Sequence, residues 1–344
     1  MATLITGGGG YIGARIARRL LDTSDDELIL WTHAPSPGSD PRVRTVVGEI
    51  TSEEPFAGVD PRSVRRIVHG AAVTRFNVDA ETATAVNVEG TRSLLRFAAR
   101  CPALESLDFL STIYVAGLRD GVIAEEPCDA AARFANEYER SKWEAELLVL
   151  DADLPWRIQR IATVIADDDG GRVVQQNAVH NTLKLLYYGL LSLLPGKPEV
   201  PLYFVTGDFV TRSAVAVMES APLHGFYHLC HTRQESLTLG DFVDAVFAAF
   251  ESDPKFRARR ALKPLYTDAE SFELLVQQVS SFSAGILGQA VGSVAPFARE
   301  LFSVKEFRND RLRSIDSIPA APDPKRLVEN VCQNLLATRF GTAC

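Results

Sequence analysis

Residues 2–21, ATLITGGGGYIGARIARRLL, set four consecutive glycines between an apolar run and a run rich in alanine and arginine. Inside regular structure each glycine costs roughly 0.5–1 kcal/mol relative to alanine, so such a cluster needs a reason. Gly7, Gly10 and Gly13 have GxxGxxG spacing. At a turn between a strand and a helix, the first glycine permits a tight bend, the second lets a pyrophosphate approach the backbone, and the third lets the helix pack closely on the strand. The stretch therefore predicts the first strand–helix turn of a dinucleotide-binding fold.

The rest of the first half alternates between strand-length apolar runs and helical patterns. Near-continuous apolar strands separated by helices are typical of a parallel sheet covered on both faces. We therefore predict an α/β fold: a Rossmann-type, doubly wound parallel sheet with a smaller, mostly helical C-terminal part that binds substrate. The expected NAD(P)-binding domain is 1–166, with strands returning from about 200–231, and the expected substrate-binding part is 167–199 and 232–344.

The second half has looser patterning, and five elements are expected in it. They are apolar helices over Leu183–Leu194 and Leu274–Ala298, a short strand in PLYFVTGDFV (201–210), a strand in GFYHLCH (225–231), and a last helix from about Lys325. The two apolar helices fit a core, and the alternative is a wall or lid around a hydrophobic acyl chain.

The composition is that of an ordinary globular enzyme, with 46% hydrophobic residues, 23% charged residues and a net charge of −8. A chain with this charge has no excess of basic residues to bind a phosphate backbone, so we expect no nucleic-acid partner. Five scattered cysteines without CxxC spacing predict reduced thiols in a cytoplasmic protein. A strand-like run begins within three residues of the N-terminus, so no secretion signal is expected. Glutamines, serines and a proline interrupt Leu274–Ala298, which favours an amphipathic helix pair over membrane contact.

The end of the second expected strand bears on the choice of cofactor. About twenty residues after the glycines, NAD-binding folds place an acidic side chain that binds the ribose 2′-hydroxyl. This chain has Thr32 and His33 there, in LILWTHA, and no carboxylate. A 2′-phosphate would meet no repulsion, and Arg15, His33 or Arg42 could pair with it. We therefore favour NADP(H) over NAD(H).

Three side chains predict a hydride-transfer site. Tyr138 and Lys142 are four residues apart in EYERSKWEAE, a segment of good helix formers, so both lie on one helix face. An ammonium group there would lower the pKa of the phenol and make it a proton donor near neutral pH. A strand ending in Ser111-Thr112 brings a hydroxyl to the carboxyl edge of the sheet, where ligands of open α/β sheets bind. Thr112, Tyr138 and Lys142 then supply two donors for a carbonyl oxygen and one cation. The YxxxK pair alone would favour a solvated helix face, and the hydroxyl at the end of the Ser111-Thr112 strand shifts the interpretation to a reactive site.

Five segments together resemble the extended short-chain dehydrogenase/reductase superfamily: TGGGGYIG, VHGAAV, NVEGTRSLL, STIYVAG and YERSKWEAE. The last two resemble its thioester-reductase branch, as do YYGLLSLLPG and YFVTGDFVTRSAVAV. That branch includes the terminal reductase domains of nonribosomal peptide and polyketide synthetases, carboxylic acid reductases, and fatty acyl-CoA reductases of the male-sterility type. The resemblance covers most of residues 1–230 and implies that Thr112, Tyr138 and Lys142 form the catalytic triad.

The resemblance also implies a cofactor site. Its residues are Gly7, Gly10, Tyr11, Ile12, Gly13, Thr32, His33, Glu49, Ile50, Ala71, Ala72, Tyr138 and Lys142. Glu49 would lie near the adenine, where an aspartate is usual, and Asn87 would be a buried helix position that supports the site. Three departures from the family pattern bear on the cofactor and the substrate loop. The family has an arginine where this chain has His33, and a proline where this chain has Ile161, directly after Arg160. The glycine that the family has a little later is missing from the segment VIADDDGG.

The activity implied is NAD(P)H-dependent reduction of a thioester to an aldehyde, and on to the alcohol if the aldehyde is retained. The sequence carries no adenylation or carrier domain, so the acyl or peptidyl thioester would arrive on a separate carrier protein or coenzyme A. A homodimer through a helix pair is compatible with the superfamily. The alternatives are a short-chain reductase of a free ketone or aldehyde, a nucleotide-sugar epimerase, and a cofactor-binding regulator without turnover.

Two polar clusters have simpler explanations than catalysis. His228 and Cys230 would point to one face of a strand and His231 to the other, so with His224 they converge poorly on a metal, and we expect none. The run Asp167–Asp169, before two glycines, is expected to be a solvated turn and not an acid catalyst.

Overall fold

The computed structural model describes residues 1–34, 40–129, 133–281, 292 and 294–341. Its centre is a seven-stranded sheet whose neighbouring strands are all parallel, in the order β12-β7-β5-β4-β1-β2-β3. The strands are β1 (Ala2–Thr6), β2 (Glu27–Thr32), β3 (Val43–Val47), β4 (Val64–His69), β5 (Ser106–Thr112), β7 (Trp156–Ile161) and β12 (Gly225–Leu229). The order reverses between β1 and β4, so the sheet is doubly wound, as predicted. This reversal is where open α/β sheets bind their ligands.

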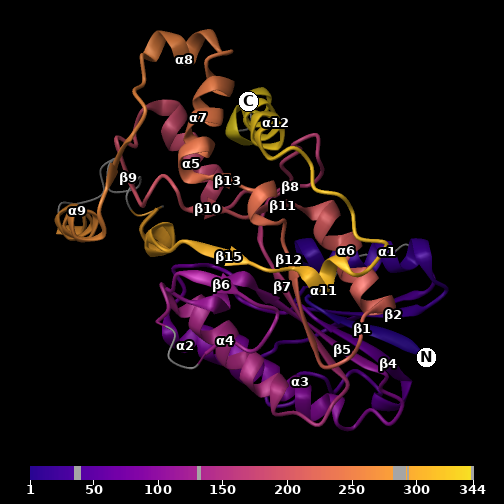
Figure 1. The fold of residues 1–344 in the computed structure, drawn as a ribbon. Coiled ribbons are helices and arrows are strands. Elements are labelled where there is room, and N and C mark those ends of the chain that lie inside the picture. The colour runs from indigo at the N-terminus through magenta and orange to yellow at the C-terminus, as the bar shows by residue number, and fades with distance from the viewer. Residues whose placement is uncertain (35–39, 130–132, 282–291, 293, 342–344) are drawn as a thin grey trace.

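Helices cover both faces of this sheet (Figure 1). They are α1 (Tyr11–Thr23) and α6 (Gly207–Ser220) on one face, and α3 (Gly90–Ala98) and α4 (Glu137–Leu150) on the other. Adjacent residues of β1 divide between the two layers, because side chains alternate along a strand. Ile5 belongs to the core under α1 and α6, and Leu4 to the core under α3 and α4.

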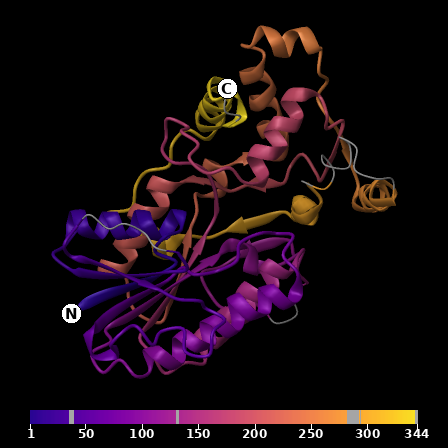
Figure 2. The same cartoon turned by 180° about the vertical axis from the view of Figure 1, so that it is seen from behind.

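The C-terminal part lies to one side of the sheet and is mostly helical (Figures 1 and 2). Its helices are α5 (Ala178–Tyr188), α7 (Leu239–Phe250), α8 (Pro254–Arg259), α9 (Ala269–Ser281) and α12 (Pro324–Ala337), whereas α11 (Asp310–Arg313) packs on β12 of the sheet. The last helix begins one residue before the predicted start. Side chains of α5, α7 and α12 share one core. Within the described ranges, no helix has the length and apolar character needed to cross a membrane.

Four short strand pairs lie outside the main sheet in the described residues. The parallel pairs are β6 (Gly121–Ile123) with β15 (Lys305–Phe307), β8 (Thr163–Ala166) with β11 (Phe204–Thr206), and β9 (Leu193–Pro195) with β14 (Leu265–Thr267). The antiparallel pair is β10 (Pro201–Leu202) with β13 (Leu237–Thr238). Short helical turns occupy Pro61–Ser63, Ala80–Ala83 (α2), Thr84–Glu89, Ile113–Ala116, Arg233–Glu235, Arg299–Phe302 and Arg339–Gly341.

Two element predictions for the second half need correction. The helix expected over Leu183–Leu194 ends at Tyr188, because Gly189 adopts a left-handed conformation with φ 67° and caps it, and the apolar residues that follow form β9. The strand expected over 201–210 is two short strands, β10 and β11, after which α6 begins at Gly207. Of the helix expected over Leu274–Ala298, residues up to Ser281 belong to α9, and 282–291 and 293 lie outside the described residues.

Candidate active site

The glycine turn between β1 and α1 has no room for a side chain at Gly7 or at Gly13. Gly7 has a φ of 71°, and a Cβ on it would lie 2.8 Å from the Ala71 backbone nitrogen. A Cβ on Gly13 would lie 2.3 Å from the Gly7 carbonyl oxygen. Gly10 is the N-cap residue of α1, so the helix points its free backbone N–H groups out of this turn. Such a bare, electropositive backbone cradle fits the pyrophosphate of a dinucleotide.

A cavity of about 800 Å³ opens from this turn and runs between the sheet and the C-terminal part. Of the residues predicted for the site, those that line it are Gly7, Gly10, Tyr11, Ile12, Gly13, Ala72, Thr112, Tyr138 and Lys142. Thr32, His33, Glu49, Ile50 and Ala71 are outside its lining. The structure thus brings together the glycine turn and the three residues predicted for hydride transfer.

Thr112 and Tyr138 meet at the sheet edge. Thr112 is the last residue of β5, and Tyr138 lies in the first turn of α4, which Asn136 caps through its side chain. Both are almost completely buried. Burial raises the pKa of Tyr138 to about 12, and a hydrogen bond with the Thr112 side chain offsets part of that rise.

The surroundings of Lys142 bear on the pKa that was predicted for Tyr138. Its Nζ donates to the Leu110 carbonyl oxygen at 2.8 Å and stands 4.1 Å from the centre of the Phe109 ring. Burial lowers the pKa of Lys142 to about 8. The predicted lowering of the pKa of Tyr138 by the ammonium group is therefore wrong for this structure, because burial of the phenol dominates and the ammonium is turned to a strand carbonyl.

Asn87 is a buried residue that is hydrogen-bonded to α4. It lies in the π-helical turn Thr84–Glu89 and is 2% exposed. Its amide donates to the Ser141 hydroxyl at 2.9 Å and to the Val73 carbonyl oxygen at 3.1 Å, while its Oδ1 accepts from Val73 N at 2.9 Å. These bonds fix the loop after β4 against α4. Its burial on a helix agrees with the expectation from the resemblance.

A buried ion pair behind the site was missed by the sequence reasoning. Arg160 Nη2 donates to Glu146 Oε2 at 2.7 Å, and the Ser111 hydroxyl donates to Glu146 Oε1 at 2.5 Å. Both charged side chains are at most 2% exposed. The pair joins the ends of β5 and β7 to α4, next to Thr112. A glutamate four residues after Lys142, on the same helix face, was the available signal.

The end of β2 is only partly as predicted. Thr32 is buried, with its hydroxyl donating to the Ala34 carbonyl oxygen at 2.6 Å, and His33 is exposed. Arg42 donates to the carbonyl oxygens of Leu21 and Ser24 and pairs with an aspartate, and Arg15 pairs with Asp167. Arg15 and Arg42 thus both have partners within the protein. Of the three basic residues predicted to pair with a 2′-phosphate, His33 is the exposed one.

Two further cofactor predictions end up away from the cavity. Glu49 is exposed, and its carboxylate accepts from the Thr51 backbone and hydroxyl. Ile50 packs in the core, where a Cβ on Gly90 would lie 2.6 Å from its Cγ1.

Asp167 is not in a solvated turn, which corrects another expectation. Its side chain is 3% exposed and accepts hydrogen bonds from Tyr11 at 2.8 Å, from Arg15 and from Arg172. Burial acts to raise the pKa of Asp167, but these donors outweigh it and hold that pKa below its usual value. Tyr11 in turn is tight against α6, since a Cβ on Gly207 would lie 2.2 Å from its hydroxyl. Asp167 thereby ties the glycine turn to the loop that starts after β8.

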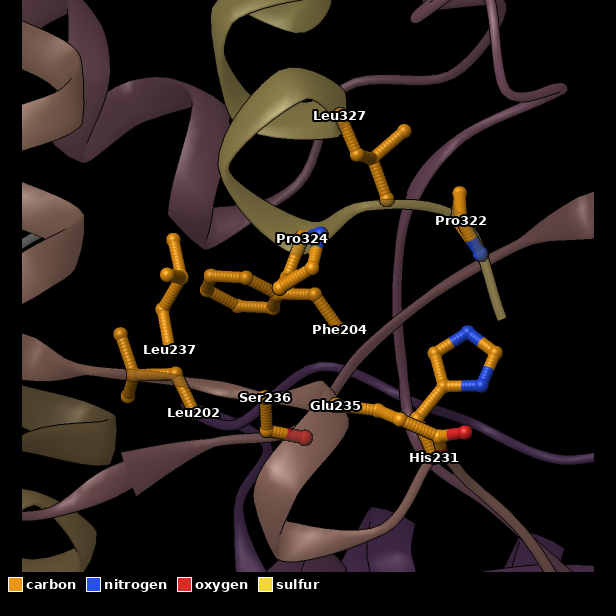
Figure 3. A pocket seen from close by; sticks show the side chains of 9 residues that line it. All are labelled: Leu202, Phe204, His231, Glu235, Ser236, Leu237, Pro322, Pro324 and Leu327. Carbon is orange, nitrogen blue, oxygen red and sulfur yellow. The ribbon is translucent and has the colours of Figure 1, made fainter.

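The histidine cluster forms no converging site. His228 is buried between an Arg160 nitrogen and the Arg308 carbonyl oxygen. His231 borders a separate cavity of about 10 Å³, where neither of its ring nitrogens has a hydrogen-bond partner among the described residues (Figure 3). A space of that size holds one water at most. No group of three or more metal-ligating side chains occurs within the described ranges.

Comparison with known proteins identifies the family of this chain. The model of the male sterility protein family matches residues 39–214, just over half of the sequence. The chain belongs to the male sterility protein family. It is an NAD(P)-binding oxidoreductase of the extended short-chain dehydrogenase/reductase type.

Two curated relatives match this chain over only part of their own length. A 3-beta-hydroxysteroid dehydrogenase from Mycolicibacterium neoaurum is 31% identical over 156 residues, which are 43% of this chain and 42% of that protein. An isonitrile lipopeptide synthase from Streptomyces coeruleorubidus is 28% identical over 215 residues, which are 53% of this chain and 14% of that protein. The matches thus span less than half of either relative.

Solved structures share the fold over nearly the whole chain. The terminal R domain of the myxalamid PKS-NRPS pathway has a TM-score of 0.77 at 21% identity, covering 98% of this chain and 91% of that one. UDP-glucuronic acid 4-epimerase from Bacillus cereus, in complex with NAD, has a TM-score of 0.67 at 16% identity, covering 99% and 100%. At these identities the likeness describes the fold alone.

Proposed function

We propose that this family member is an NAD(P)H-dependent reductase that converts an acyl or peptidyl thioester, carried on a separate carrier protein or on coenzyme A, to an aldehyde. The observation that carries the proposal is that Thr112, Tyr138 and Lys142 line the same cavity as the glycine turn. The match to the male sterility family and the fold shared with a terminal R domain support the thioester as substrate class.

The residues act on the carbonyl oxygen of the thioester. When bound, the reduced nicotinamide supplies a hydride for the carbonyl carbon. Thr112 Oγ1 and Tyr138 Oη donate hydrogen bonds to the oxygen as negative charge develops on it. The pKa of Tyr138, about 12, keeps the phenol protonated at neutral pH, so it can transfer a proton to that oxygen. Lys142 lines the same cavity, and its ammonium adds positive charge to the site in which the negative charge develops. Breaking of the C–S bond then releases a thiol and the aldehyde.

We also propose a preference for NADP(H). No carboxylate directly follows Thr32 to repel a 2′-phosphate, and the imidazole of His33, just after the end of β2, is exposed. Titration calorimetry with NADPH and NADH on the wild type and on His33→Asp tests this. We expect NADPH to bind more tightly to the wild type, and the aspartate to reverse the order. Tighter NADH binding by the wild type would contradict the assignment.

The reaction is tested by following cofactor oxidation with acyl-CoA and acyl-carrier thioesters, free aldehydes and ketones, and nucleotide sugars. We expect oxidation with thioesters and loss of that rate in Tyr138→Phe. Tyr227→Phe is the matched control, because its hydroxyl donates to the Pro222 carbonyl oxygen, outside the cavity lining. Oxidation only with free carbonyls, or turnover only of nucleotide sugars, would replace thioester reduction by one of the alternative activities.

A further inference from the structure

Among the described residues, three charged side chains line the main cavity, and two of them already have partners within the protein. Lys142 is buried and donates to the Leu110 carbonyl oxygen. The carboxylate of Asp167 is held between Arg15 and Arg172. Neither group is therefore available to a charged substrate without breaking a contact inside the protein.

The third is Arg75, in the loop between β4 and α2. It is exposed, and its guanidinium makes no hydrogen bond or ion pair with any residue that the structure describes. Asp79 is the acidic group that feels its charge, but the Asp79 carboxylate already accepts from the Thr82 backbone and hydroxyl at 2.8 and 2.9 Å. The five donors of Arg75 remain available to a molecule in the cavity.

The loop that carries Arg75 borders the proposed reaction centre. The ring of Phe76 meets the ring of Tyr138 edge-on at 5.6 Å and that of Tyr114 at 5.4 Å, and lies 6.3 Å from the ring of Phe297. This side of the cavity is thus an aromatic wall, and the residue before Phe76 in the chain is an arginine whose donors make no hydrogen bond with the described residues. Such a wall fits an apolar acyl group, and the cation fits an anion on the same substrate.

We infer that Arg75 is a substrate-specificity residue that binds an oxyanion of the thioester substrate, either the phosphate of a pantetheine-type arm or a carboxylate on the acyl chain. The inference rests on the proposed function. A guanidinium presents a planar fork of donors that pairs with phosphate or carboxylate through two parallel hydrogen bonds. Charge-assisted bonds of this kind correspond to about a ten- to hundredfold gain in kcat/KM when the uncharged analogue lacks them.

The test compares three synthetic thioesters with the full chain and NADPH. They are a neutral acyl-pantetheine, the same thioester with a 4′-phosphate on the pantetheine, and a pantetheine thioester whose acyl chain ends in a carboxylate. We expect one of the two anionic thioesters to exceed the neutral one in kcat/KM by about tenfold or more, and the arm that does so identifies the anion. Arg75→Gln should abolish this advantage and leave the neutral thioester unaffected, while Arg75→Lys should retain part of it. Arg92→Gln, which removes an exposed arginine on α3, is the control that should change nothing.

Three results would overturn the assignment: no advantage for either anionic thioester, an advantage that survives in Arg75→Gln, or an Arg75→Gln variant whose NADPH dissociation constant rises in calorimetry without substrate. The last would assign the guanidinium to the cofactor. If the wild type reduces no thioester at all, the proposed function fails. The comparison is then made with matched neutral and carboxylate-bearing aldehydes, where the same loss in Arg75→Gln would uphold the anion site and its absence would refute it.

Discussion

Replacing Lys142 by methionine should make the protein more stable while it abolishes reductase activity. The pKa of Lys142 is lowered by burial from 10.5 to about 8. Each tenfold change in proton affinity corresponds to about 1.4 kcal/mol, so keeping this ammonium charged inside the folded protein at pH 7 costs about 3 kcal/mol relative to the unfolded chain. Methionine has similar length and no charge. It loses the hydrogen bond to the Leu110 carbonyl oxygen, worth about 1 kcal/mol.

The net expectation is a gain of about 2 kcal/mol, or a rise in Tm of about 3 °C for a chain of this length. Urea unfolding of the wild type and the variant from pH 7 to pH 10.5 measures it. Below the folded pKa of about 8, lysine is charged in both the folded and unfolded states, so the wild type carries the full penalty. As the pH rises from about 8 to 10.5, only the folded state loses its proton, so the stability gap between the two proteins should close.

Lys325→Met is the control, because Lys325 is exposed at the start of α12. Its stability should track that of the wild type at every pH. A Lys142→Met protein that is less stable than the wild type at pH 7, or a stability gap that stays constant up to pH 10.5, would refute the reasoning.

Three more measurements follow from the same geometry. Gly13→Ala should raise the NADPH dissociation constant measured by calorimetry by about tenfold or more, because its Cβ would collide with the Gly7 carbonyl oxygen. Gly9→Ala is the control: its Cβ would lie 3.4 Å from the nearest atom, so the dissociation constant should stay near that of the wild type. Equal effects of the two substitutions would contradict the assignment of the glycine turn to the pyrophosphate. Asp167→Asn should lower the free energy of unfolding by about 2 kcal/mol in urea, since it leaves two arginines without their shared carboxylate, and an unchanged midpoint would count against a buried pair. The pH profile of kcat/KM should fall as the pH rises through about 8, where Lys142 loses its charge, and a flat profile to pH 10 would separate that charge from catalysis.

Local sequence patterns predicted the parts of the molecule that depend on neighbours in the chain. The glycine turn, the strands with continuous apolar runs and the helix with Tyr138 and Lys142 all follow from spacing within a few residues. The convergence of Thr112 with that pair could also be expected, because the carboxyl ends of parallel strands share one edge.

The remaining features depend on contacts between distant segments. Asp167 looks like part of an acidic turn until Tyr11 and Arg15, more than 150 positions earlier, are seen to donate to it. The raised pKa of Tyr138 reflects burial by the whole site. The helix expected over Leu183–Leu194 stops at Gly189 because its apolar continuation pairs as a strand with Leu265–Thr267.

The hydrogen bonds and ion pairs around Asp167 also limit how this enzyme can be re-engineered. Residues 173–179 line the cavity and are an obvious target for exchange with the corresponding loops of other members of the family. Asp167, at the root of that loop, is anchored to Tyr11 and Arg15 on the first helix. A grafted loop without an acidic residue at position 167 would leave the donors of Tyr11 and Arg15 without their acceptor beside the glycine turn. The new loop and α1 therefore have to be chosen together.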